Sequence, residues 1–411
     1  MSIYRTLTDD VRRVLGDWRK MAFVSGPRQV GKTTLAKSLL ASQPGRYFNW
    51  DLASDRKTFA RDQAFFEKDA AGDPASRPLV VFDELHKYAR WKNYLKGIFD
   101  GFSDRFAFMV TGSGRLDVYR RGGDSLLGRY LPLGLFPLTV AELAGTRATW
   151  ASFQAGLGAL EESQAAGGES FASLLRLGGF PEPFLRGREA FHRAWSAGRT
   201  ERLIREDIRD ATRLRELSLV EMLAHLLPER VGSPLSLNSM REDLGVAFET
   251  VRAWVGVLDA FYYSFRIPPW TKRVSRALRK ETKLYLWDWA EVDGEEDRQG
   301  ARFENLVALH LLKAVRTWTQ MGEARLDLAY IRDKEKREVD FVVTENNQPR
   351  VLVECRMSDS QLSPYLLAFQ ERLNVAYAVQ LVRQPGHARR TTIGGRQQWV
   401  VSADRWLGKL V

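Results

Sequence analysis

The residues with the clearest chemistry form one short run that fits G-x-x-x-x-G-K-[ST]: Gly26-Pro27-Arg28-Gln29-Val30-Gly31-Lys32-Thr33. Glycines at these spacings let the backbone turn sharply, so that successive N–H groups point at a phosphate. We expect Lys32 to reach the β- and γ-phosphates of a nucleotide and the Thr33 hydroxyl to hold Mg²⁺. The predicted nucleotide-binding residues are this run and Thr34. The alternative is a glycine turn with a solvated lysine.

The flanks of this run predict the elements that must position it. Met21–Ser25 is apolar enough for a buried strand entering the loop, and Thr34–Leu40 is typical of a helix leaving it. A helix at this point adds the positive end of its dipole to the phosphate site. The order strand, loop, helix is the context that the motif requires.

A second apolar run, Leu79–Phe82, ends in Asp83 and Glu84. Fully apolar strands suit the middle of a parallel sheet, and ligands bind where such strands end. We therefore expect Asp83 to lie behind the Mg²⁺ and Glu84 to polarise the attacking water. A strand followed by a charged helix cap is the alternative.

A third apolar run, Phe106–Val110, is followed by Thr111, Gly112 and Ser113. A small hydroxyl at the tip of a neighbouring strand can contact the water or the γ-phosphate. We predict this sensing role for Ser113. A serine in a turn is an equally open interpretation.

Composition sets limits on the class of protein. A chain of 411 residues suggests two to four domains, and 44% hydrophobic with 27% charged residues is ordinary for a globular protein. No apolar run approaches bilayer length, the amino terminus lacks the apolar core of a secretion signal, and Cys355 alone cannot form an internal disulfide. We expect a cytoplasmic protein with no membrane partner. The net charge of +11 favours a polyanion, usually nucleic acid.

Four segments follow from the pattern of periodicity and breaks. We expect an α/β nucleotide domain over residues 1–140, a helical lid or linker over 141–215, a helix-turn-helix domain over 216–295 and a further domain over 296–411. Within the third, Leu237–Leu244 and Phe248–Asp259 are predicted helices, and Tyr262–Ile267 with Lys283–Trp287 a β-hairpin that makes a winged form.

The predicted hairpin carries a run of cations opposed only by Glu281. Its members are Arg266, Lys272, Arg273, Arg276, Arg279, Lys280 and Lys283, with Trp270 among them. Such a set suits a phosphate backbone, and we predict DNA contact through Lys272, Arg273, Arg276, Arg279 and Lys280. Many helix-turn-helix folds instead dock proteins, so docking or plain solvation remains the alternative.

The last domain resembles the PD-(D/E)xK nuclease-like fold, in which an acidic residue on one strand and E-x-K on the next converge on Mg²⁺, bound by two or three carboxylates. Matched residue by residue, the carboxylates are Glu304, Asp340 and Glu354. The usual lysine is replaced by Arg356, which cannot give up a proton at working pH. We therefore favour a degenerate site kept for structure or DNA contact over an active nuclease. Surface pairs made by strand-end charges are the third interpretation.

GPRQVGKTTL, LVVFDELHK, VTGSG, LLGRY, LFPLTVAEL and GGFPEP together resemble AAA+-type ATPases of a widespread prokaryotic family. Members join this ATPase to a carboxy-terminal domain of unknown function. The resemblance implies a parallel P-loop sheet with a helical lid, followed by a winged helix and a restriction-nuclease-like α/β domain. It also implies ATP and Mg²⁺, self-association into a ring, expected to be a hexamer, and DNA as partner. Arg129 matches the arginine offered to a neighbour's γ-phosphate, although a solvated surface arginine is the open alternative and Arg115, Arg120 and Arg121 lie close by.

The function expected from these features is ATP hydrolysis coupled at subunit interfaces to remodelling of, or translocation on, branched or duplex DNA. Two alternatives stay open. One is a nucleotide-controlled switch that docks a protein partner, and the other is an ATP-dependent, metal-requiring DNA endonuclease.

Overall fold

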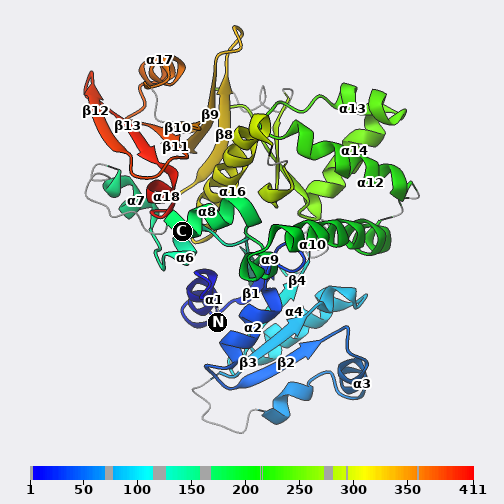
Figure 1. The fold of residues 1–411 in the computed structure, drawn as a ribbon. Helices are drawn as coiled ribbons and strands as arrows, with labels where there is room; N and C mark the ends of the chain where they lie inside the picture. Colours follow the sequence, from blue (N-terminus) through cyan, green and yellow to red (C-terminus); the bar gives the residue numbers. More distant parts are fainter. Residues whose placement is uncertain are drawn as a thin grey trace. The chain divides into compact units, whose positions relative to one another are not determined.

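The computed structural model describes residues 3–69, 77–113, 126–157, 168–212, 214, 216–272, 281–292, 295–358 and 361–411. The chain forms two compact units (Figure 1). The first is Tyr4–Phe136, and the second is Pro137–Val411 together with the first three residues of the chain. The units divide between Phe136 and Pro137, and the domain boundary predicted at residue 140 stays a prediction. The finer divisions predicted within the second unit remain predictions.

The first unit is built on a parallel five-stranded sheet in the order β2-β3-β4-β1-β5 (Figure 1). Its strands are β1 Met21–Ser25, β2 Gly45–Asn49, β3 Leu79–Asp83, β4 Ala107–Gly112 and β5 Tyr130–Gly134. Every residue of β1, β3 and β4 is buried, as the apolar runs predict for strands covered on both faces. The three predicted inner strands are confirmed.

Helices and a cluster of aromatic rings cover this sheet. The helices are α1 Leu7–Gly16, α2 Lys32–Leu40, α3 Ala53–Arg61 and α4 Trp91–Phe102, with short 3₁₀ turns at η1 Phe65–Asp69 and η3 Leu85–Lys87. Phe66 packs edge-on against Phe106 and Phe108, with ring centroids 5.1 and 5.6 Å apart. Such edge-on aromatic pairs stabilise the core beyond the apolar area that they bury. They therefore help to hold in place the strands that end at the predicted site.

The second unit begins with helices, as predicted for residues 141–215. They are α6 Val140–Leu143, α7 Trp150–Gly156, α8 Gly168–Leu177, α9 Pro181–Arg186, α10 Glu189–Arg202, the π-helical η5 Leu203–Ile208 and α11 Arg209–Ala211. Residues 158–167 lie outside the described part of the chain.

The GGFPEP turn between α8 and α9 needs both of its glycines. Gly178 has φ +73°, and a Cβ there would lie 2.3 Å from Asp288 Oδ1. A Cβ on Gly179 would lie 2.6 Å from the Trp289 ring and 2.7 Å from the Leu138 carbonyl oxygen. The turn is therefore pressed against the segment that follows the hairpin.

Helices and an antiparallel strand pair lie where the sequence predicts them, and their assignment to a winged helix-turn-helix stays a prediction. The elements are α12 Leu217–Leu226, η6 Leu227–Arg230, α13 Leu237–Leu244, α14 Phe248–Ala260 and an antiparallel pair, β6 Ser264–Ile267 with β7 Lys283–Leu286. Gly245 ends α13 in the left-handed conformation, φ +66°. Val251, Val255 and Leu258 of α14 are buried.

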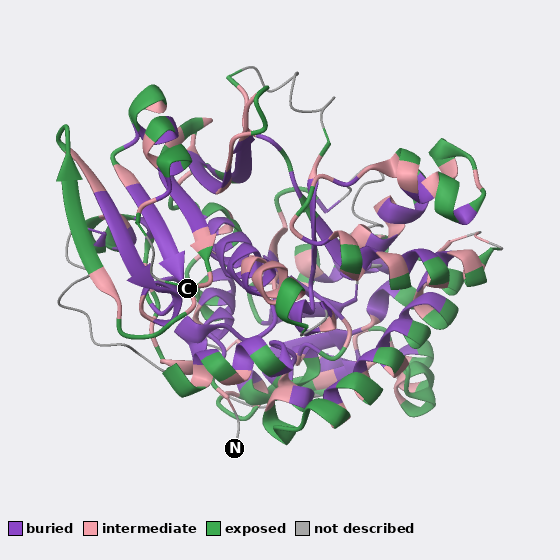
Figure 2. Ribbon diagram, turned by 45° about the horizontal axis from the view of Figure 1, so that its top comes forward, coloured by how far each residue is buried: buried purple, intermediate pink, exposed green. Residues whose placement is uncertain are grey.

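The chain then builds a mixed six-stranded sheet in the order β12-β13-β11-β10-β9-β8. The elements are η7 Trp289–Glu291, η8 Glu296–Arg298, α16 Gln299–Gln320, β8 Leu326–Arg332, β9 Glu338–Glu345, β10 Gln348–Arg356, α17 Pro364–Leu373, β11 Tyr377–Val382, β12 Ala388–Ile393, β13 Arg396–Ser402 and α18 Ala403–Leu407. Strands β8, β9 and β10 are antiparallel neighbours, whereas β11 runs parallel to β10 and β13. Figure 2 shows buried inner strands and an exposed edge strand, β12. None of the described helices is long and apolar enough to cross a bilayer.

Candidate nucleotide-binding site

The Gly26–Thr33 loop joins β1 to α2 as the sequence predicts. Gly31 precedes α2 with φ +102°, and Gln29 also has a positive φ of +64°. A Cβ on Gly26 would lie 2.3 Å from the Leu135 carbonyl oxygen, so only glycine fits beside the chain that leaves β5. The loop therefore has a fixed, tightly packed course at the amino end of a helix, where backbone N–H groups favour anions.

The Lys32 side chain lies back across its own loop. Its ammonium group donates to the Gly26 carbonyl at 3.0 Å and to the Pro27 carbonyl at 2.7 Å, and the residue is buried. These two carbonyls hold the ammonium charge close to the loop. A phosphate that replaced them would gain a charge-assisted contact.

The loop is also held from outside the motif. Arg5, which is buried, donates from Nη1 to the Val30 carbonyl at 2.9 Å and from Nη2 to the Phe136 carbonyl. These bonds occupy the carbonyl oxygen at the middle of the loop. Sequence reasoning missed Arg5, because a single arginine before the first helix carries no motif.

Asp83, at the end of β3, accepts hydrogen bonds from three hydroxyl groups. Thr33 Oγ1 donates at 2.9 Å and Thr111 Oγ1 at 2.5 Å, and the Tyr47 hydroxyl donates to the same oxygen as Thr33. Burial and the neighbouring Asp83 carboxylate raise the pKa of Tyr47 well above its usual value, so its hydroxyl stays a donor. The structure thus brings together Thr33 and Asp83, the two predicted Mg²⁺ ligands.

Tyr47 and Thr111 are the residues that sequence reasoning missed at this point. In the sheet register, Tyr47 pairs with Val81 and Thr111 pairs with Asp83. Alternate residues of a strand share a face, so Tyr47, Val81 and Asp83 project to the same side. The alternation of side chains along each strand could have indicated that these residues share a face. Using it would have required the register of three parallel strands.

Glu84 turns away from the strand direction in a left-handed conformation, φ +57°. Its Oε2 lies 3.5 Å from His86 Nε2 and 3.6 Å from Lys87 Nζ, and Lys87 also pairs with Asp51 at 2.6 Å. Burial raises the pKa of Glu84, although Lys87 and Lys32 act to lower it. A carboxylate with a raised pKa beside the phosphate loop has the property expected of a general base.

The structure places the two remaining predicted catalytic residues differently. Ser113 is buried just beyond β4, and the hydroxyl that contacts Asp83 is that of Thr111, two residues earlier. Arg129, before β5, makes a bidentate pair with Asp100 of α4, with distances of 2.7 and 2.9 Å. Its role toward a neighbouring subunit stays a prediction. Arg115, Arg120 and Arg121 lie outside the described residues.

The cationic hairpin differs from the prediction. Lys283 is buried and belongs to a carboxylate cluster, so counting it among the loop cations was wrong. Arg266 pairs with Asp259 at 2.6 Å, whereas Lys272 is exposed. Arg273, Arg276, Arg279 and Lys280 lie outside the described residues.

The carboxylates matched to the nuclease pattern do come together, around Lys283. Glu304 from α16 and Asp340 from β9 each lie within 3.3 Å of its ammonium nitrogen. Glu354 on β10 accepts from Arg356 at 2.7 Å, and its other oxygen is buried without a hydrogen-bond partner among the described residues. Burial and the nearby Asp340 raise the pKa of Glu354 to about 8 and that of Glu304 to about 7. These are not the solvated surface pairs of the third interpretation.

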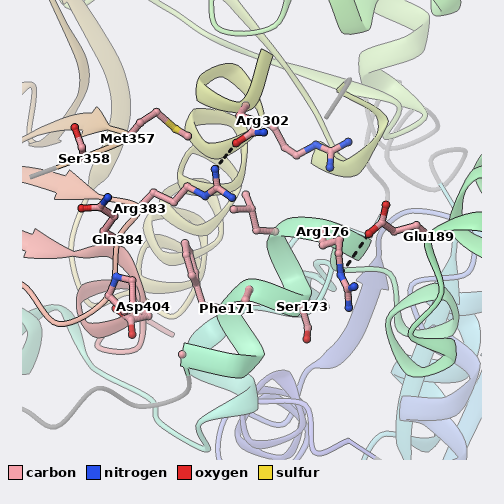
Figure 3. Close-up of a pocket in the computed structure, with 15 residues that line it drawn as sticks. Phe171, Ser173, Arg176, Glu189, Arg302, Met357, Ser358, Arg383, Gln384 and Asp404 are labelled. Atoms are coloured by element: carbon pink, nitrogen blue, oxygen red, sulfur yellow. Dashed lines mark hydrogen bonds and ion pairs between the residues drawn. The ribbon is translucent and has the colours of Figure 1, made fainter. Parts of the chain in front are cut away.

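A cavity of about 910 Å³ also lies in the second unit (Figure 3). Its lining includes Arg302, which donates to the Ala290 and Val292 carbonyls, and Arg383, which donates to the Gln299 side chain. Arg176 lies 3.6 Å from Glu189. The three arginines that face this cavity therefore already have acceptors within the chain.

Three family models match successive parts of the chain. Residues 18–144 match a family described as "AAA domain", residues 168–290 a "Domain of unknown function (DUF8612)" and residues 299–405 a "Domain of unknown function (DUF4143)". The first match and the phosphate loop support an AAA-type P-loop ATPase domain with an ATP-binding site. The family of the last match is itself described as one of unknown function.

Curated relatives and solved structures are more distant. Uncharacterized proteins of Mycobacterium tuberculosis and Mycobacterium bovis are each 23% identical over 325 residues, which cover 75% of this chain and 67% of theirs. A Walker-type ATPase of Pyrococcus abyssi is similar with a TM-score of 0.44 and 14% identity, over 71% of this chain and 95% of that one.

Proposed function

We propose that this chain hydrolyses ATP at the Gly26–Thr33 loop and uses the reaction to remodel or translocate duplex or branched DNA. The observation that carries the hydrolytic half is the contact between Thr33 and Asp83, which brings a loop hydroxyl and a strand-end carboxylate to one point. Mg²⁺ bound with ATP would neutralise charge between the β- and γ-phosphates. Thr33 and Asp83 would hold it.

The chain's own residues supply the remaining steps. Lys32 exchanges its two carbonyl acceptors for phosphate oxygens, because phosphate offers the stronger, charge-assisted bond. Thr111 and Tyr47 keep the Asp83 carboxylate in one orientation during this exchange. Glu84 takes a proton from the attacking water, and its raised pKa brings it nearer to working pH than an ordinary glutamate.

Steady-state hydrolysis of ATP with Mg²⁺ tests this assignment. Lys32→Ala is expected to lose both nucleotide binding and hydrolysis, whereas Glu84→Gln should still bind a fluorescent ATP analogue while hydrolysing at least 100-fold more slowly. Lys57→Ala, which removes an exposed lysine of α3, is the matched control and should keep the parent rate. Parent-level hydrolysis by Glu84→Gln would show that another group acts as the base.

DNA is the proposed partner because the chain carries a net charge of +11 and a cation-rich hairpin connection that begins at exposed Lys272. Binding through phosphates releases counterions, so affinity should fall steeply with salt, with a log–log slope of about −0.9 per phosphate contact. Binding of duplex, forked and four-way DNA at several salt concentrations measures this slope. Arg273→Ala with Arg276→Ala should weaken binding and flatten the slope. Absence of binding at low salt removes DNA as the partner.

A protein-docking switch is the second candidate, and the surface of the helix-turn-helix favours it. Residues 237–260 carry two arginines against four acidic residues. Arg241 lies 3.4 Å from Glu242, and Arg252 lies 2.5 Å from Glu249. These helices therefore offer a phosphate backbone little positive charge. A docking switch would bind its partner with weak salt dependence and would be insensitive to Arg273→Ala and Arg276→Ala.

An endonuclease is the third candidate. The order α16-β8-β9-β10-α17-β11 and the meeting of Glu304 with Asp340 support a nuclease-like core. The absence of the expected lysine at Arg356 favours a silent module. Supercoiled and branched DNA incubated with Mg²⁺ or Mn²⁺ should stay intact. Nicking that disappears in Asp340→Ala would overturn this part of the proposal.

A further inference from the structure

The carboxylate cluster of the second unit surrounds a lysine that the hairpin supplies. The Lys283 ammonium group lies 2.6 Å from Glu338 Oε1, 3.0 Å from Glu304 Oε1 and 3.3 Å from Asp340 Oδ1. An ammonium group has three N–H donors, so these three oxygens use all of them. The Lys283 side chain is 1% exposed, which leaves the nitrogen out of reach of bulk water.

The carboxylates also have partners other than Lys283. The Tyr285 hydroxyl donates to Glu304 Oε1 at 2.6 Å, and the Cys355 backbone N–H donates to Asp340 Oδ2 at 2.8 Å. Arg332 lies 3.5 Å from the second oxygen of Glu338. Three carboxylates are therefore grouped around one ammonium nitrogen and are held there by further donors.

A divalent metal does not fit this arrangement. Mg²⁺ requires nearly octahedral oxygen ligands at about 2.0–2.1 Å and usually keeps several waters, for which a buried ammonium group leaves no room. Within the described residues, no three His, Cys, Asp or Glu side chains are placed to hold one metal ion. The nuclease-like carboxylates, as they are arranged around Lys283, therefore do not fit a divalent metal at this position.

We propose that the Lys283 ammonium group is the resident cation of this cluster and takes the place that a divalent metal holds in a nuclease of this type. The lysine comes from β7, while its partners come from α16 and β9, so the charge that completes the cluster belongs to the hairpin. The carboxylates then serve to anchor the hairpin on the sheet. Neutralising Lys283 leaves the carboxylates unpaired and opens the position to a metal.

Mn²⁺ binding without nucleotide tests this inference, since it is independent of ATP hydrolysis. Free Mn²⁺ is measured by electron paramagnetic resonance at pH 8 with the parent chain, Lys283→Met and Lys283→Gln. In the parent chain, Asp340→Asn should leave the number of Mn²⁺ sites unchanged. Each Lys283 variant should gain one site per chain that is lost when Asp340→Asn is added. Lys272→Met, which removes an exposed lysine of the same connection, should gain none.

Thermal unfolding supplies a second readout. Saturating Mn²⁺ should raise the melting temperature of Lys283→Met by about 5 °C or more and leave that of the parent unchanged. A parent chain that binds Mn²⁺ at a site removed by Asp340→Asn would overturn the proposal, even if neither Lys283 variant folds. Folded Lys283 variants that gain no site would overturn it as well.

Discussion

The Thr33 hydroxyl donates a 2.9 Å hydrogen bond to Asp83, which ties the phosphate loop to the end of a strand that is not adjacent to the loop's own strand. Strand β4 lies between them and contributes Thr111 to the same carboxylate. Three segments therefore meet at one acidic side chain.

Removal of the Tyr47 hydroxyl tests how much its hydrogen bond to Asp83 contributes to stability and to ATP hydrolysis. A hydrogen bond to a charged group contributes about 1.5–3 kcal/mol, so Tyr47→Phe should lower the unfolding free energy by about 1–2 kcal/mol. Hydrolysis should fall less than tenfold, whereas Asp83→Asn should lower it at least 100-fold. Urea unfolding and ATPase rates measure both, with Tyr88→Phe as the control tyrosine.

The Glu84 carboxylate should lower the free energy of unfolding at neutral pH. Its folded-state pKa is raised, so the folded chain holds the proton more tightly, and the associated stability is present at low pH and lost as pH rises. Glu84→Gln should therefore be more stable than the parent at pH 8, with the difference shrinking toward pH 4. Thermal melts across this range measure it. A variant equally destabilised at every pH would contradict the expected sign.

Arg129 can be tested by mixing subunits. If it acts on a neighbour's nucleotide, Arg129→Ala and Lys32→Ala chains should each be inactive, yet a mixture should regain part of the activity, because some interfaces then hold both residues. The parent rate should also depend on protein concentration. Asp100→Asn removes the bidentate partner of Arg129 and should leave hydrolysis within a few-fold of the parent. A mixture as inactive as its components would leave Arg129 with a structural role.

The GGFPEP turn should tolerate no side chain at Gly179. A methyl group there meets the Trp289 ring at 2.6 Å and backbone at 2.7 Å, so Gly179→Ala should destabilise the second unit by about 1–3 kcal/mol. Gly256→Ala is the matched control, because nothing lies within 4 Å of a Cβ at that helical position. The control should be neutral or stabilise by up to about 1 kcal/mol. Chemical denaturation of both variants measures the contrast.

The buried pair of His192 and Asp288 should contribute stability in an acidic window. Burial acts to lower the pKa of His192, but the Asp288 carboxylate 2.9 Å away raises it overall, while the pKa of Asp288 is lowered. The histidine contribution is present below about pH 6.5 and is lost as pH rises through its folded pKa, and the aspartate contribution is lost in strong acid. The stability difference between the parent and His192→Gln should be largest between about pH 4 and 6.5. A difference that grows toward pH 9 would refute the pairing.

The phosphate loop and the inner strands of the first sheet could be predicted because their signals are local. Glycine spacing and unbroken apolar runs carry the information within a few residues, and the strands lie where those runs fall. Residues 237–244 form the predicted helix for the same reason, since apolar periodicity and a terminal glycine define it. Meeting points such as Tyr47 with Asp83 depend on strand register, which no local pattern gives.

Lys283 illustrates the limit more sharply. Within the sequence it is one cation in a run of seven, and charge counting assigns it to the solvent. Its partners Glu304, Glu338 and Asp340 lie 21 to 57 residues further along the chain and reach it only once the sheet has formed. Burial of a charge is decided by such distant partners, so a local pattern predicts the residue type and not its environment.

Arg5 carries a practical consequence for anyone trimming this protein. The AAA-domain match begins at residue 18, and a fragment cut there would retain the whole glycine-lysine motif. It would lack α1 and the guanidinium group that fastens the Val30 and Phe136 carbonyls. In such a fragment the phosphate loop would lack the two hydrogen bonds from Arg5. A weak nucleotide affinity measured on the fragment would then result from their loss and would not describe the full chain.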